Sequence, residues 1–117
     1  MGERITFKRP DGKEAAGYLA KAAKAGAPGL VVIQEWWGLN EQIKGITDRF
    51  AAAGFTALAP DLYRGTAVPL TEPDEAAKHM MALEMGEAAQ HLSGAVDELL
   101  RRTGRRSVGV VGFCMGG

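Results

Sequence analysis

The sequence of 117 residues lacks an excess of either charge, a second cysteine and any long apolar run. Its 14 basic and 14 acidic residues cancel, which argues against binding to nucleic acid or to an anionic membrane through overall charge. A single cysteine can form no internal disulfide, which is typical of a reducing compartment. Neither an apolar signal core nor a stretch of about 18 apolar residues is present, so we expect a cytoplasmic protein with no membrane partner.

Short apolar runs alternate with helical patterns along the chain, whose 46% hydrophobic and 24% charged residues are ordinary for a globular protein. The length allows one domain at most, residues 1–117. The order of strands and helices predicts an α/β fold with a mostly parallel sheet wrapped by helices. We expect strands at 4–8 and 14–23 that form a hairpin with a turn at 9–12, and strands at 30–33, 55–59 and 107–111, of which the apolar run at 30–33 is typical of a strand buried on both faces. We also expect a helix that is capped by Asn40, ends near Ala53 and is stopped by Gly54, and helical structure from Thr71 to Thr103 with a break near Gly86.

The last six residues place the lone cysteine, Cys114, in a G-x-C-x-G frame directly after the last predicted strand. A nucleophile at a sharp turn from strand to helix needs small neighbours, and Gly112 and Gly116 stand at those two positions. The amide of Met115 would then supply half of an oxyanion hole. The frame therefore predicts a nucleophilic Cys114.

Two other interpretations of this frame are open. Cys114 can be a small buried hydrophobe beside glycines that only form a turn. Glycines after a strand also bind phosphate, but neither the dinucleotide spacing G-x-G-x-x-G nor the P-loop spacing is present. We therefore expect no nucleotide cofactor, and no metal.

Polar residues follow the other buried strands, where the carboxyl ends of parallel strands meet at one edge. Burying a carboxylate is costly unless it is paired, so Glu35 is either exposed or functional, and an ion pair with Arg64 is the structural alternative. The adjacent Trp36 and Trp37 can pack in the core or line an apolar pocket.

Three motifs together resemble the N-terminal half of the dienelactone hydrolase family, which includes carboxymethylenebutenolidase. They are Gln-Glu-Trp-Trp-Gly-Leu-Asn at 34–40, Ala-Pro-Asp-Leu-Tyr at 59–63 and Gly-Phe-Cys-Met-Gly-Gly at 112–117. These enzymes are cysteine hydrolases of the α/β-hydrolase fold. The resemblance implies that residues 1–117 are the N-terminal part of a single α/β-hydrolase domain, ending at the nucleophile elbow.

The resemblance also implies a reaction on a small ester or lactone. Cys114 would attack the carbonyl carbon to give an acyl-enzyme that water hydrolyses. The backbone amides of Trp36 and Met115 would form the oxyanion hole. Glu35 would contact the resting thiol and help to deprotonate it when substrate binds, and a carboxylate so close is expected to raise the thiol's pKa and protect it from oxidation.

For substrate binding, the resemblance implies that Trp37 lines the pocket and that Arg64 stands in for the arginines with which relatives bind a substrate carboxylate. The family's catalytic aspartate and histidine follow the nucleophile, whereas His79 and His91 precede Cys114 and are interpreted as surface or packing residues. Two readings follow: a hydrolase completed by a C-terminal half, possibly on a second polypeptide, or a non-catalytic module that is inactive by itself.

Overall fold

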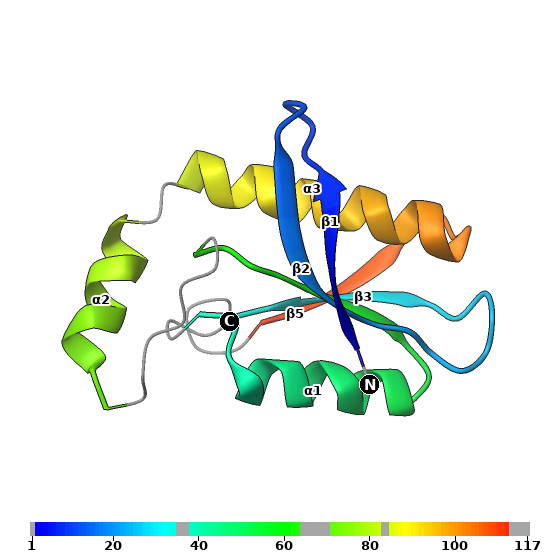
Figure 1. The fold of residues 1–117 in the computed structure, drawn as a ribbon. Coiled ribbons are helices and arrows are strands. Elements are labelled where there is room, and N and C mark those ends of the chain that lie inside the picture. Colours follow the sequence, from blue (N-terminus) through cyan, green and yellow to red (C-terminus); the bar gives the residue numbers. More distant parts are fainter. Residues whose placement is uncertain (1, 35–37, 64–70, 83–84, 113–117) are drawn as a thin grey trace.

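The computed structural model describes residues 2–34, 38–63, 71–82 and 85–112, which form a sheet with helices on both faces (Figure 1). The strands are β1 (Glu3–Lys8), β2 (Glu14–Ala20), β3 (Gly29–Ile33), β4 (Thr56–Pro60) and β5 (Val108–Gly112). The helices are α1 (Glu41–Ala52), α2 (Pro73–Ala82) and α3 (Met85–Thr103).

The sheet is mixed, with strand order β1-β2-β4-β3-β5. β1 and β2 form the predicted antiparallel hairpin, and β2 also pairs antiparallel with β4. β4, β3 and β5 are parallel to one another and form the parallel part that the sequence predicts. Their connections run through α1 on one face and α3 on the opposite face (Figure 1). The α/β architecture is therefore confirmed.

Two apolar layers hold the helices to the sheet. The layer under α3 consists of Phe7, Ala15, Leu19, Val31, Leu58, Ala95 and Leu99. The layer under α1 consists of Leu30, Val32, Leu39, Ile43, Ala57 and Ala59. Side chains of a strand alternate between its two faces, so β3 and β4 supply both layers and read as continuous apolar runs.

The helix ends follow the predicted capping chemistry. The side-chain oxygen of Asn40 accepts a hydrogen bond of 3.1 Å from the amide of Ile43, which satisfies a donor that the first turn of α1 leaves free. Gly54 has a φ of 108°, a left-handed conformation that favours glycine after a helix. The predicted break near Gly86 is confirmed to within a few residues, because α2 ends at Ala82 and α3 begins at Met85, so that Gly86 lies in the first turn of α3.

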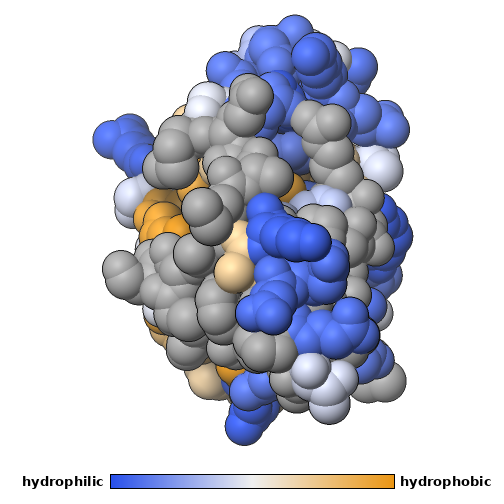
Figure 2. All heavy atoms as spheres, turned by 90° about the vertical axis from the view of Figure 1, so that its left-hand side faces the viewer, coloured by the Kyte–Doolittle hydropathy of each residue, from blue (hydrophilic) through white to orange (hydrophobic). Residues whose placement is uncertain are grey.

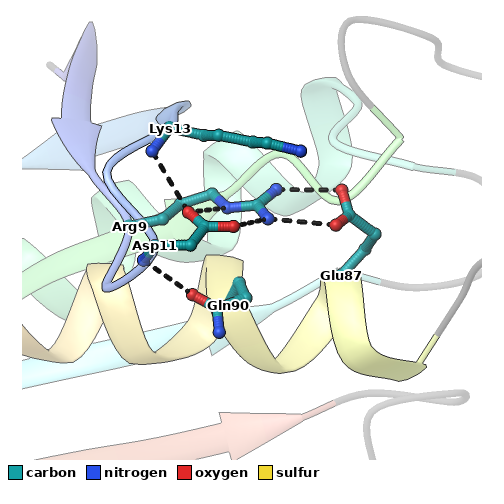
Figure 3. Close-up of polar contacts among 5 residues, drawn as sticks. All are labelled: Arg9, Asp11, Lys13, Glu87 and Gln90. Atoms are coloured by element: carbon teal, nitrogen blue, oxygen red, sulfur yellow. Dashed lines mark hydrogen bonds and ion pairs between the residues drawn. The ribbon is translucent and has the colours of Figure 1, made fainter.

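A buried arginine fastens the β1–β2 turn to α3 (Figure 3). The Arg9 side chain is 2% exposed and donates hydrogen bonds to both carboxylate oxygens of Glu87, at 2.9 and 3.0 Å, and to Asp11. The Asp11 amide donates to the side chain of Gln90, and Asp11 in turn accepts from the Lys13 amide. Hydrogen bonds to Glu87 and then Asp11 raise the pKa of Arg9, and the bond from Arg9 lowers the pKa of Asp11.

Candidate functional site

The carboxyl ends of the parallel strands β3, β4 and β5 lie at one edge of the sheet, on the left in Figure 1. Figure 2 views the molecule from that side, where hydrophilic residues cover much of the described surface beside a small hydrophobic area. In the sequence, the predicted site residues follow the strands that end at this edge. All of them lie outside the described residues: Glu35, Trp36, Trp37, Arg64, Cys114 and Met115. The contacts of these six residues stay predictions, and the site is described through the residues that flank them in the chain.

The register of the parallel ladder relates two of the predicted segments directly. Ile33, the last residue of β3, is the Cα partner of Gly112, the last residue of β5. The chain therefore leaves both strands at the same level of the sheet. Glu35 and Cys114 each follow two residues after this pair.

The two faces of β3 and β5 are assigned by their side chains. Val31, Ile33 and Val108 belong to or pack against the layer under α3, whereas Val111 packs against the layer under α1. By this alternation Gly112 has the same orientation as its partner Ile33. The last residues of both strands consequently lie on the face of the sheet that α3 covers.

Gln34 ties the end of β3 to the segment after β4. Its side chain is fully buried, and its Oε1 accepts a hydrogen bond of 3.0 Å from the amide of Leu62. Within the described part of the chain, no acceptor lies within hydrogen-bond distance of its Nε2, which is also buried. An unpaired buried amide group costs about 1–3 kcal/mol. We did not single out Gln34 from the sequence, although a polar residue directly after a buried apolar strand is a usable signal.

The segment after β4 is held close to the sheet. The Asp61 amide donates a hydrogen bond of 2.8 Å to the carbonyl of Ala16, and the Asp61 carboxylate lies 3.6 Å from a guanidinium nitrogen of Arg4. Leu62 and Tyr63 are buried, and burial raises the pKa of the Tyr63 hydroxyl. These three residues are therefore a buried continuation of β4, in which Leu62 is hydrogen-bonded to Gln34 at the end of β3.

The two histidines were interpreted from the sequence as surface or packing residues, and the structure describes the side chain of one of them. His91 is 3% exposed and lies within α3, as expected of a packing residue. The side chain of His79 falls outside the described residues. Within the described ranges, no three His, Cys, Asp or Glu residues are grouped in a way that could hold a metal ion. Nor does any described helix combine the length and apolar character needed to cross a membrane.

The comparisons with known sequences indicate the same family. The sequence model of the dienelactone hydrolase family matches residues 15–117. "Protein usf" of Aquifex pyrophilus is 42% identical over 125 residues, which cover 100% of this chain and 52% of that protein. Carboxymethylenebutenolidase of Pseudomonas putida is 30% identical over 128 residues, which cover 100% of this chain and 53% of that enzyme.

The fold is shared with solved structures as well. The structure named m3DLH superposes with a TM-score of 0.78 at 24% identity, covering 99% of this chain and 50% of that chain. This chain thus has the α/β-hydrolase fold, and it spans about half the length of the curated relatives it matches. Since the family's sequence model extends from β2 through all the parallel strands to residue 117, the chain belongs to the dienelactone hydrolase family.

Proposed function

We propose that this chain is the N-terminal part of a cysteine-dependent hydrolase of carboxylic esters or lactones, with Cys114 as its nucleophile. The observation that carries the proposal is the pairing of Ile33 with Gly112. Because the chain leaves these two adjacent strands at the same level, Glu35 and Cys114 would both lie just beyond this edge of the sheet. Neighbouring strands are about 4.8 Å apart, which brings a carboxylate and a thiol within reach of each other.

The reaction we propose begins with proton transfer from the Cys114 thiol to Glu35 when substrate binds. The thiolate attacks the carbonyl carbon, a C–S bond forms, and the amides of Trp36 and Met115 bind the oxyanion. Collapse of this intermediate breaks the C–O bond and expels the alkoxide, which takes the proton from Glu35, and leaves a thioester on Cys114. Water then attacks the thioester, the carboxylic acid departs, and the sulfur is protonated again.

Substrate recognition and the general base complete the proposal. Trp37 would line the pocket, and Arg64 would bind a substrate carboxylate. Hydrolysis of the thioester needs a base to activate water, and His91 is buried as a packing residue in α3. We propose that a C-terminal half carrying an aspartate and a histidine supplies that base, on the same or on a second polypeptide. A catalytic thiol also favours a reducing, cytoplasmic location.

The test compares residues 1–117 alone with the same residues joined to the C-terminal half of the Aquifex pyrophilus relative, which we call the completed protein. We expect hydrolysis of p-nitrophenyl acetate by the completed protein and none above background by residues 1–117, because we propose that the general base for the thioester belongs to the C-terminal half. Cys114→Ala should abolish turnover in the completed protein. Turnover that survives this substitution would refute the proposed nucleophile.

The alternative function is a non-catalytic module. It is favoured for residues 1–117 by themselves because His91 is buried in α3 as a packing residue and therefore does not supply the general base. The same assay separates the two readings. A completed protein that folds, as judged by circular dichroism and gel filtration, yet shows no turnover would support the non-catalytic module.

A further inference from the structure

A single buried side chain links two of the segments that build the proposed site. Gln34 is the first residue after β3 and directly precedes Glu35 and Trp36 in the chain. Its Oε1 accepts the Leu62 amide hydrogen at 3.0 Å, across from the end of one strand to the segment after the next. The link lies in the buried interior, since both Gln34 and Leu62 are closed to solvent.

Burying the amide side chain of Gln34 at this position costs free energy. Gln34 is 0% exposed, and among the described residues only its Oε1 has a partner, while its Nε2 has none. A leucine or methionine of similar volume would fill the same space without burying an unpaired donor. Packing alone therefore does not explain a glutamine here, whereas a need to hold the Leu62 amide does.

The segments that Gln34 joins have different roles in the proposed reaction. One carries Glu35 and the oxyanion-hole amide of Trp36. The other contains the buried residues Leu62 and Tyr63, of which Leu62 donates its amide hydrogen to Gln34. Small displacements of such groups slow a reaction strongly, because the substrate must meet the oxyanion donors and the nucleophile in one geometry.

We propose that Gln34 is a positioning residue, whose Oε1 holds the segment after β4 against the segment that carries the oxyanion-hole amide. This inference rests on the proposed ester or lactone hydrolysis. It adds a requirement for an acceptor oxygen at position 34, a residue that does not itself touch the reacting atoms. It also accounts for the exposed fraction of zero, since a positioning group needs no access from solvent.

The experiment measures kcat, KM and thermal stability in the completed protein for Gln34→Leu and Gln34→Glu. Gln34→Leu removes the acceptor, and we expect kcat/KM to fall about tenfold or more, mainly through kcat, with only a small change in Tm. The change in Tm is expected to be small because, among the described residues, one buried unpaired donor, the Leu62 amide, takes the place of another, the Gln34 Nε2.

Gln34→Glu keeps an acceptor oxygen and is closest to glutamine in shape when its carboxyl is protonated. Burial favours that neutral form, so the activity of Gln34→Glu relative to the parent should rise as the pH is lowered. A merely structural role would not produce this change in the ratio. This variant also keeps the inference testable if Gln34→Leu fails to fold.

Thr47→Val is the matched control, because the Thr47 hydroxyl is also fully buried and donates a 2.7 Å bond to the Ile43 carbonyl within α1. It should change Tm without lowering kcat/KM. The inference is overturned if Gln34→Leu keeps kcat/KM within about twofold of the parent, or if the Gln34→Glu ratio does not vary with pH. Failure of the proposed function is recognised separately, by turnover that survives Cys114→Ala.

Discussion

Replacing Gly94 by alanine should destabilise the protein even though alanine is the better helix former. Gly94 lies in α3 where the helix passes the end of β1, and an added Cβ would stand 2.7 Å from the Lys8 carbonyl oxygen and 3.2 Å from the Arg9 Cα. Both neighbours are backbone atoms, so the helix itself would have to move away from the hairpin. That movement would also disturb the bonds from Arg9 to Glu87 that Figure 3 shows.

The magnitude follows from two opposing effects. Alanine gains about 1 kcal/mol over glycine in a helix interior, and overpacking a tight contact costs about 1–3 kcal/mol. Gly45 provides the matched control, because it lies within α1 and an added Cβ there would meet nothing within 4 Å. Gly45→Ala should therefore stabilise the protein by up to about 1 kcal/mol, and Gly94→Ala should be about 1–3 kcal/mol less stable than Gly45→Ala.

Urea denaturation of the completed protein, followed by tryptophan fluorescence, gives both free energies of unfolding. The quantity that tests the reasoning is the difference between the two variants, because the gain in helix propensity is common to both. Equal shifts in the urea midpoint for Gly94→Ala and Gly45→Ala would show that α3 has room beside the hairpin. In that case the close approach between Gly94 and Lys8 would be refuted.

Two further predictions concern charge and the thiol. The pKa of Asp11 is lowered in the fold, chiefly by the bond from Arg9, so its contribution to stability is present above its unfolded pKa near 3.8 and lost as the pH falls through the lower folded value. Asp11→Asn should flatten this acid limb in urea titrations from about pH 5 to 2, and an unchanged limb would contradict the assignment. Cys114 is the only cysteine of residues 1–117, so the part of the iodoacetamide uptake that Cys114→Ala removes from the completed protein reports on it alone. We expect slow uptake at neutral pH without substrate and faster uptake in Glu35→Gln, while rapid uptake in the parent would contradict a protected thiol.

Local sequence signals predicted most of the elements. Asn40 and Gly54 bracket α1 as expected, because a cap side chain and a left-handed glycine act on the residues next to them. The apolar run at Leu30 predicted a strand buried on both faces, and the structure confirms it. Such signals depend on neighbours in the chain, which is why a single sequence contains them.

Contacts between distant residues were not predictable in the same way. The sequence indicated only a turn at 9–12, whereas Arg9 is buried there and bonded to Glu87, 78 residues away. The position of β4 between β2 and β3 in the sheet likewise depends on pairing that no local pattern specifies. Gln34 belongs to the same class, because its significance comes from the Leu62 amide, 28 residues further along.

The two apolar layers explain why reactive chemistry in this fold is expected at the sheet edge. Along β3, Val31 and Val32 enter opposite layers, and both are closed to solvent. A polar group placed within the strand would displace core packing on one face or the other and remain without water. Beyond Ile33 the strand has ended, so successive side chains no longer fill the two apolar layers in turn. The first residue there, Gln34, is polar and accepts a hydrogen bond from Leu62 in the segment after β4. The positions that follow Ile33 and Gly112 are consequently where a carboxylate and a thiol can be held close together without loss of the core.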